Sequence, residues 1–247
     1  MEAAQPHGRM LGLMQSPAYD SLWRSYWGDM QRLGPVHRHI REDIVRRVGE
    51  LDVKSILDVG CGAGDNLAAL NLTGRYELAG VDVSQEAIDL AREKVPDAQL
   101  HVLDVEREKL QQKFDLVMTV QVVEHIVDDM AALRNMAAMT RKYLFVSTLA
   151  GRMRASEVLT GHVRNYSAVE LRRKLEAAGL EVLDVRGWGF PWYSPLYRSV
   201  IELLPGGPPA GPTNGVARLG ARALYQLYRT NLPRRGDVIS ALARSAA

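Results

Sequence analysis

A glycine-rich run directly after a short apolar segment constrains this chain more than any other feature. The stretch Ser55–Val59 is almost wholly apolar, and the sequence then continues GCGAGD into a helical pattern. A buried strand that leads through small residues into a helix lets the backbone approach a ligand closely, and the helix N-terminus points at that ligand. A nucleotide-like cofactor is therefore the first hypothesis for Gly60, Cys61, Gly62 and Gly64, and a purely structural turn is the alternative.

Short apolar runs alternate with helical patterns over most of the chain. Apolar strands separated by helices are typical of a parallel sheet buried on both faces, so we expect an α/β fold. The expected strands are residues 55–59, 78–83, 99–103, 114–119, 143–147, 180–186 and 238–243. The expected helices between them are residues 65–70, 85–93 and 128–139, and one that Ser167 and Glu170 open as a capping box.

Acidic residues end two further strands of the expected sheet. Asp82 follows the second strand, where a carboxylate can accept both hydroxyls of a ribose, and Asp104 follows the third, where it could accept an adenine amino group. A dinucleotide-binding turn needs a third glycine at the position that Asp65 occupies here, which disfavours a pyrophosphate cradle.

These residues resemble the class I S-adenosylmethionine-dependent methyltransferases. The resemblance covers roughly residues 50–187 and lies in DVGCGAG, in Asp82, in the triplet LDV at 103–105 and in VVEHI at 122–126. It implies a Rossmann-like sheet of seven strands with helices on both faces and an antiparallel last strand. It also implies S-adenosylmethionine as cofactor, S-adenosylhomocysteine as product, and the following cofactor-binding residues: Asp58, Gly60, Cys61, Gly62, Gly64, Asp82, Val83, Asp104, Val105 and Gln121.

Two histidines are the expected catalytic residues. His125 begins the turn after the fourth strand, beside the expected cofactor, and His162 precedes the capped helix, where it could take a proton from the acceptor. The segment 122–126 also resembles the ubiquinone-biosynthesis O-methyltransferases and the 2′-O-methyltransferases of small-RNA 3′ ends. The resemblance implies a divalent cation at Gln121, Glu124, His125 and His162, but the neutral Gln121 replaces a carboxylate, so we expect no metal.

Aromatic residues gather before and after the expected core. We expect residues 1–50 to form a helical lid, 51–187 the cofactor-binding core, 188–236 a cap inserted between the last two strands, and 237–247 the final strand and tail, all in one structural domain. The lid and cap would close over the open edge of the sheet and form an apolar acceptor pocket, although an aromatic stripe is also typical of a core. The expected acceptor-binding residues are Tyr19, Trp23, Arg164, Tyr166, Trp188 and Trp192.

Charge and composition limit the partners of the chain. Residues 1–150 carry 17 basic and 22 acidic residues, whereas residues 151–247 carry 14 and 7. The basic tail fits a solvated surface, an anionic substrate, a membrane face or nucleic acid, and its arginines are too scattered for a nucleic-acid groove. Two segments near 197–204 and 218–228 have apolar residues at helical spacing with arginine opposite; we favour a pocket cover over peripheral membrane contact for them.

The sequence therefore predicts methyl transfer to a small-molecule acceptor, with a hydroxyl as the expected target. N- or C-methylation, a lipid-like or glycosylated acceptor, RNA methylation and a non-catalytic cofactor-binding scaffold stay open, and the oligomeric state is not predicted. With no apolar run of membrane-spanning length and no secretory signal pattern, we expect a cytoplasmic protein.

Overall fold

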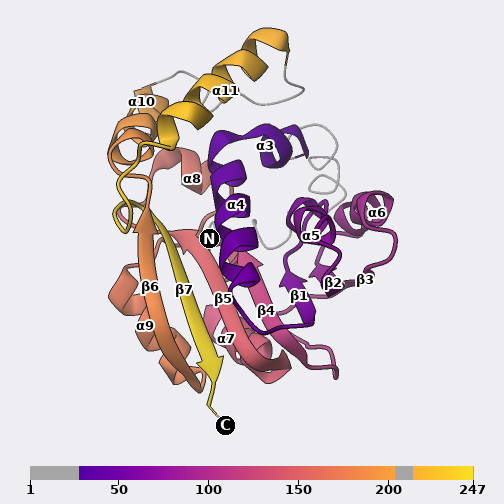
Figure 1. The fold of residues 1–247 in the computed structure, drawn as a ribbon. Helices are drawn as coiled ribbons and strands as arrows, with labels where there is room; N and C mark the ends of the chain where they lie inside the picture. Colours follow the sequence, from indigo (N-terminus) through magenta and orange to yellow (C-terminus); the bar gives the residue numbers. More distant parts are fainter. Residues whose placement is uncertain (1–27, 204–213, 247) are drawn as a thin grey trace, which may run out of the picture.

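The computed structural model describes residues 28–203 and 214–246, and its centre is a seven-stranded sheet. The strand order is β3-β2-β1-β4-β5-β7-β6, and β7 runs antiparallel to both of its neighbours while β1 to β5 pair in parallel (Figure 1). The predicted fold class is confirmed, including the antiparallel last strand.

The bounds of the elements agree with most expected ranges. The strands are β1 Ser55–Val59, β2 Glu77–Asp82, β3 Gln99–Val102, β4 Phe114–Val120, β5 Thr140–Leu149, β6 Leu180–Trp188 and β7 Val238–Ser245. The helices of the first half are α3 Gly28–Leu33, α4 Pro35–Gly49, α5 Asp65–Asn71, α6 Gln85–Lys94, the short η2 Val123–His125 and α7 Asp129–Met139. The helices of the second half are α8 Ala155–Leu159, α9 Ala168–Ala177, η3 Trp192–Tyr197, α10 Arg198–Leu203 and α11 Gly215–Tyr228.

Both faces of the sheet are covered by helices, as buried parallel strands require. Successive side chains of β1 enter opposite layers: Leu57 packs in the cluster that contains α7 and α9, and Ile56 in the cluster that contains α4, α5 and α6. Figure 1 shows α7 and α9 on one side of the sheet and α4 on the other. The two layers hold the strand ends, and hence the loops that follow them, in fixed positions.

Local capping explains where the core helices begin. The Ser84 hydroxyl accepts the Ala87 N–H at 3.2 Å and caps α6. The Ser167 hydroxyl accepts the Glu170 N–H at 3.0 Å, which confirms the serine cap predicted for α9. Helix α8 was not predicted, because it has only five residues and shows no apolar periodicity. Its start is held by the Glu157 carboxylate, which accepts the Arg154 N–H at 3.1 Å.

The second half of the chain builds a cap beyond the carboxyl ends of the parallel strands. In Figure 1, α8, α10 and α11 lie at this end of the molecule together with α3. Helices α10 and α11 match the two helical segments expected between the last strands. None of the helices within residues 28–203 and 214–246 has the length and apolar character needed to span a bilayer.

Candidate active site

The turn after β1 has the backbone geometry that only glycine adopts easily. Gly60 has φ of 73° and Gly64, the residue before α5, has φ of 78°. A Cβ on Gly60 would lie 2.4 Å from Val122 Cγ2, so the turn packs directly against the loop after β4. Glycine is thus required here both by the left-handed conformation and by the close contact.

Asp82 holds this turn in place from the end of β2. Its carboxylate accepts the Gly62 N–H at 2.9 Å and the Ser84 N–H at 3.0 Å. Asp104, after β3, accepts the Glu106 N–H at 3.0 Å and pairs with Arg107 at 3.3 Å. Both predicted acids therefore lie at neighbouring strand ends on the same edge of the sheet.

Asp58 of β1 carries a buried carboxyl group with a raised pKa. It is fully inaccessible, and neither of its oxygens has a hydrogen-bond partner of normal geometry. Burial raises its pKa to about 8, the nearby Asp82 carboxylate adds to the rise, and Asn66 opposes it. A cationic ligand above the turn would return this pKa toward its ordinary value.

A cavity of about 390 Å³ opens between the strand ends and the cap. One wall consists of the turn and strand ends, with Asp82 and Asp104 among its lining residues, and the opposite wall belongs to the cap, with Tyr193 and Tyr197. Of the predicted cofactor-binding residues, the structure places the following on the cavity wall: Gly60, Cys61, Asp82, Val83, Asp104, Val105 and Gln121. The other three predicted residues do not line the cavity and lie in β1 or in the turn that follows it: Asp58, Gly62 and Gly64.

Glu124, His125 and His162 come together at one side of the cavity. The potential ligand atoms of these three residues all lie within 4.8 Å of one another, and the two imidazole rings meet edge to face with centroids 4.6 Å apart. Glu124 accepts the Thr148 hydroxyl at 2.8 Å through one oxygen, whereas its other oxygen and His125 Nδ1 are buried without a partner. Sequence reasoning named all three residues, and the fold brings them together although His162 is distant in the chain.

Burial sets the charge of this cluster. It lowers the pKa of His125 to about 3, with further lowering by His162, and lowers the pKa of His162 to about 4. It raises the pKa of Glu124 to about 7. Both imidazoles are therefore neutral near pH 7, and each keeps one unprotonated ring nitrogen.

Arg164 and Tyr166 do not line the cavity; the structure places them beside it, in contact with α7 and η2. The Tyr166 ring is buried, and its hydroxyl donates to Asp129 at 2.7 Å and to the Val123 carbonyl at 3.1 Å. Arg164 pairs with the same Asp129 carboxylate at 2.7 Å. These bonds fix the loop that carries His162 against α7 and η2.

The predicted tryptophans also lie elsewhere. Trp188 packs against His39 with ring centroids 4.9 Å apart and lines a separate cleft together with His39. Trp192 packs at the margin of the core. Neither tryptophan lies on the cavity wall, and Tyr193 and Tyr197 of the same run line it among the described residues. Tyr19 and Trp23 lie outside the described residues.

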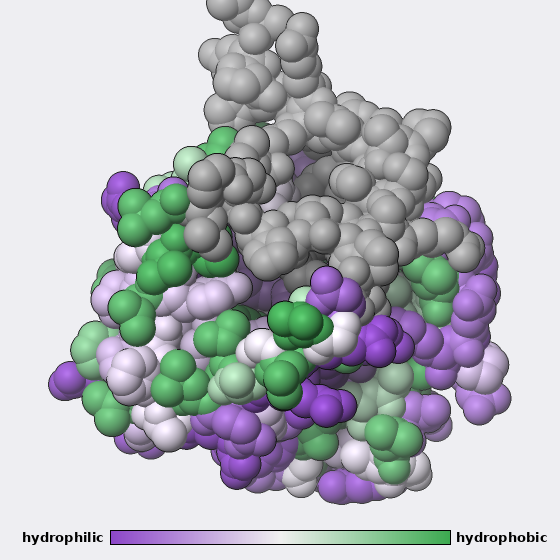
Figure 2. Space-filling model, turned by 90° about the horizontal axis from the view of Figure 1, so that it is seen from above, coloured by the Kyte–Doolittle hydropathy of each residue, from purple (hydrophilic) through white to green (hydrophobic). Residues whose placement is uncertain are grey.

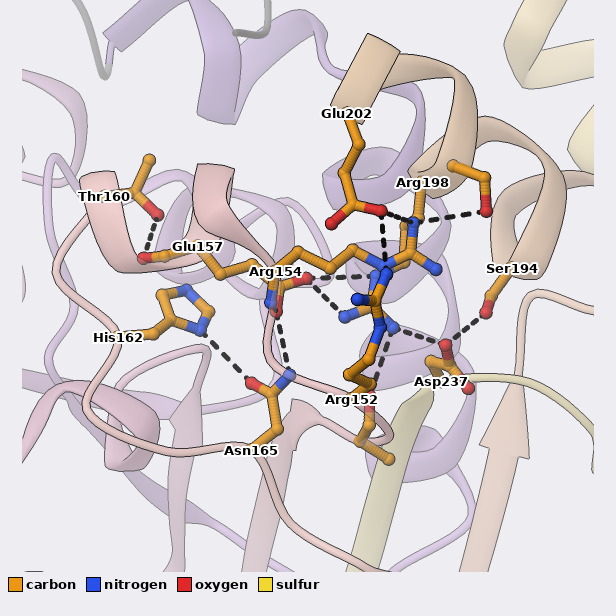
Figure 3. Close-up of polar contacts among 12 residues, drawn as sticks. Arg152, Arg154, Glu157, Thr160, His162, Asn165, Ser194, Arg198, Glu202 and Asp237 are labelled. Carbon is orange, nitrogen blue, oxygen red and sulfur yellow. Dashed lines mark hydrogen bonds and ion pairs between the residues drawn. The ribbon is translucent and has the colours of Figure 1, made fainter.

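A buried ion network on the cap side was missed by sequence reasoning (Figure 3). Arg198 donates from Nε to Glu157 at 3.1 Å and from a terminal nitrogen to the Ala150 carbonyl at 3.1 Å, and it also pairs with Asp237. The Glu157 carboxylate further accepts Asn165 Nδ2 at 2.8 Å. Because Asn165 Oδ1 contacts His162 Nδ1 at 3.5 Å, the network connects the cap to the expected catalytic histidine.

The N-terminal helix also contributes to the cavity wall. Three residues of α4 line it: His37, Ile40 and Arg41. Arg41 is held by donation to the carbonyls of Gln31 and Arg32 at 2.8 and 2.9 Å. No local motif marks these residues, because α4 precedes the core in the chain and reaches the site only by packing.

Comparison with known proteins places this site in a family. A family described as "Methyltransferase domain" matches residues 26–185. The chain belongs to this methyltransferase family. The "Ubiquinone biosynthesis O-methyltransferase" of Coxiella burnetii (strain RSA 493 / Nine Mile phase I) is 28% identical over 193 residues, which are 68% of this chain and 82% of the relative. The protein of the same name from Aeromonas salmonicida is 30% identical over 66% of this chain and 79% of the relative.

Solved structures support the same fold. The magnesium protoporphyrin IX methyltransferase of Synechocystis PCC 6803 with bound SAM aligns over 100% of both chains with a TM-score of 0.58 and 14% identity. A TehB-like SAM-dependent methyltransferase of Corynebacterium glutamicum covers 84% of this chain and 88% of its own, with a TM-score of 0.52 and 17% identity. The chain is thus a methyltransferase by its family, as the motifs predicted, and it has the fold of S-adenosylmethionine-dependent methyltransferases.

The residues at the strand ends fit this cofactor. The glycine turn leaves its backbone exposed to the cavity, and Asp82 and Asp104 lie at the expected places for a nucleoside. When bound, S-adenosylmethionine supplies a methyl group already activated on a sulfonium. The protein itself then needs to align the acceptor, exclude water and handle one proton.

Proposed function

We propose that this methyltransferase methylates a hydroxyl group of a small-molecule acceptor. The observation that carries the proposal is the imidazole pair of His125 and His162, which lines the same cavity as the residues expected to bind the cofactor. A hydroxyl is a poor nucleophile until its proton is removed, whereas a neutral amine needs no base. The names of the ubiquinone-biosynthesis relatives support the same reaction.

In this proposal His162 takes the proton of the acceptor hydroxyl. The oxygen then forms a bond to the methyl carbon as the bond from that carbon to sulfur breaks, and the sulfonium becomes a neutral thioether. His162 is placed for the role because its ring lines the cavity and its Nδ1 lies 3.5 Å from Asn165 Oδ1. His125 packs edge to face on it and restricts its position.

The cap and the N-terminal helix form the acceptor side of the pocket in this proposal. Tyr193, Tyr197 and Ile201 give that side an apolar and aromatic wall, which suits a ring or chain better than a sugar. Residues 188–236 then act as the acceptor-binding cap, and the 1–50 region acts as the lid. The Arg198 network holds the cap against the start of β7.

A divalent cation is the second candidate for activating the hydroxyl. Glu124, His125 and His162 could supply three ligand atoms, and the partnerless Glu124 oxygen and His125 Nδ1 favour this. The neutral Gln121 at the family's fourth position disfavours it. The two candidates exclude each other at His162, because an imidazole nitrogen bound to metal cannot take a proton.

The experiment is methylation of an acceptor panel with methyl-labelled S-adenosylmethionine and product detection by mass spectrometry. The panel contains catechols and phenols, the matched anilines, and the matched methyl ethers, which lack the target hydroxyl. We expect the labelled methyl group on the acceptor oxygen only. Full turnover of His162→Ala with an unaltered pH dependence would contradict the role of His162. Turnover lost after chelation and restored by one divalent cation would replace the base by the metal candidate.

A further inference from the structure

Helix α11 presents three different faces, and one of them is apolar and exposed. Residues spaced at three and four on this helix share a side. Its packed face contacts α4: the Tyr225 carbonyl accepts from His39 at 3.0 Å, and the Tyr225 hydroxyl donates to Glu42 at 2.5 Å. Tyr228, on the same face, is fully buried.

The second face is apolar and has no partner among the described residues. Val216 is 82% exposed, Leu219 68% and Leu227 38%, and helical spacing puts all three on one side. Two large apolar side chains of the neighbouring cap helix α10 are also exposed, Leu203 at 82% and Val200 at 46%. Figure 2, which looks down on this end of the molecule, shows hydrophobic surface among the described residues beside the grey atoms.

The third face of α11 carries positive charge. Arg218, Arg222 and Arg229 share it by helical spacing, and all three are exposed. The cap, residues 188–236, contains six arginines and one acidic residue, Glu202, and of the six only Arg198 is buried in the ion network. Glu202 is paired with Arg152 at 3.0 Å, so the exposed arginines of α11 have no acid of the cap to balance them.

An exposed apolar stripe beside an arginine stripe is the pattern of a helix that lies in a lipid interface. Such a helix buries its apolar side chains below the headgroups, and long arginine side chains reach back to the phosphates. The positive charge of the α11 arginines favours a lipid surface over a second copy of this chain as the binding partner. A second copy would bring arginine against arginine, whereas anionic headgroups complement the arginines. The same cap lines the cavity through Tyr197 and Ile201, so this surface lies beside the acceptor pocket.

We propose that the exposed apolar face of α11, flanked by Arg218 and Arg222, binds the surface of a membrane that contains anionic phospholipids. Binding is peripheral and reversible, and it needs no membrane-spanning segment. The proposal does not depend on hydroxyl methylation, because it concerns a face of the cap outside the cavity.

Vesicle co-sedimentation of the full chain tests the proposal. The vesicles are phosphatidylcholine alone or phosphatidylcholine with one quarter phosphatidylglycerol, at low and at 0.5 M salt. We expect binding to the anionic vesicles only, and weaker binding at high salt because the charge is screened. Pairwise substitution Arg218→Gln with Arg222→Gln should weaken binding about 10-fold or more, since each arginine near an anionic surface contributes measurably.

Matched variants separate the α11 surface from general effects. Val216→Glu with Leu219→Glu should abolish binding, and glutamate near a helix N-terminus leaves the helix intact. The controls are Val169→Glu, where the side chain is 77% exposed on α9, and Arg173→Gln on the same helix. Both controls should bind to the vesicles like the wild type.

Three results would overturn the proposal. The first is wild-type protein that stays in the supernatant with anionic vesicles. The second is binding that is equal for both vesicle types or unaffected by the α11 substitutions. The third is a dimer in sedimentation velocity that the Val216→Glu and Leu219→Glu pair dissociates, because that result assigns the face to a second copy of the chain.

Discussion

Replacement of Gly60 by alanine should damage both stability and cofactor binding. Alanine at φ of 73° costs about 1–2 kcal/mol relative to glycine. Its Cβ would also lie 2.4 Å from Val122 Cγ2, and relief of such overpacking in a tight site costs about 1–3 kcal/mol. We therefore expect the free energy of unfolding of Gly60→Ala to fall by about 2–5 kcal/mol.

The structure offers a matched control for each part of this cost. Gly74 has φ of 62° but no atom within 4 Å of an added Cβ, so Gly74→Ala should lose only the conformational part, about 1–2 kcal/mol. The second substitution Val122→Ala in the Gly60→Ala background removes the clashing methyl groups and should recover the steric part. Movement of the turn that removes about 1.4 kcal/mol of binding free energy weakens ligand binding 10-fold. The affinity for S-adenosylhomocysteine should therefore fall about 10-fold or more in Gly60→Ala.

Urea denaturation of the three variants, with calorimetric titration of S-adenosylhomocysteine, measures both effects. Equal destabilisation of Gly60→Ala and Gly74→Ala, with wild-type affinity in both, would refute the close contact between the turn and the loop after β4. Failure of Val122→Ala to recover any stability would refute the steric part alone.

Three further predictions follow from buried charges and from the lid. The pKa of Asp58 is raised to about 8 in the unliganded fold. Between the ordinary pKa of aspartate and this value, the folded protein therefore keeps a proton on Asp58 that the unfolded chain has lost. The free energy of unfolding without ligand should therefore fall as pH rises from about 4 to 8, and Asp58→Asn should lack this slope. Asp58→Asn should also lose the proton release that accompanies S-adenosylmethionine binding, which calorimetry in buffers of different ionisation enthalpy measures. The lowered pKa of Asp129, caused by Lys174, Tyr166 and Arg164, stabilises the fold above the ordinary carboxyl pKa and is lost as pH falls through the lowered value. Asp129→Asn should cost about 2–4 kcal/mol in urea denaturation and flatten the acid limb, while an unchanged acid limb would contradict the assignment. Deletion of residues 1–30 should raise the KM of the acceptor and leave the Kd of S-adenosylhomocysteine unchanged; an unchanged acceptor KM would contradict the lid.

The cofactor half of the site was predictable because its signals are local. The strand before Gly60, the acid at Asp82 and the acid at Asp104 each lie within a few residues of a strand end. Parallel strands carry their carboxyl ends to one edge, so the positions along the chain determine the positions in space. The antiparallel β7 followed from the family resemblance and not from the pattern of its residues.

The acceptor half was predicted less well because packing between distant segments creates it. Tyr166 combines an aromatic ring with a polar hydroxyl, as many pocket residues do. Its hydroxyl nevertheless donates to Asp129 of α7, and its ring is buried. Arg198 and Glu157 are 41 positions apart and have no shared pattern before α8 and α10 meet. Trp188 faces His39 of α4, a contact that nothing in the aromatic run itself indicates.

The strand-end cavity is the expected S-adenosylmethionine site, and calorimetric titration of the purified protein tests this most directly. Wild-type protein should bind S-adenosylmethionine and S-adenosylhomocysteine at one site, with chelator present or absent. Asp82→Ala, checked by circular dichroism for an intact fold, should lose that binding, because the carboxylate both orients the turn and lies where the ribose is expected. Absence of binding by the wild type, or undiminished binding by a folded Asp82→Ala, would contradict the account.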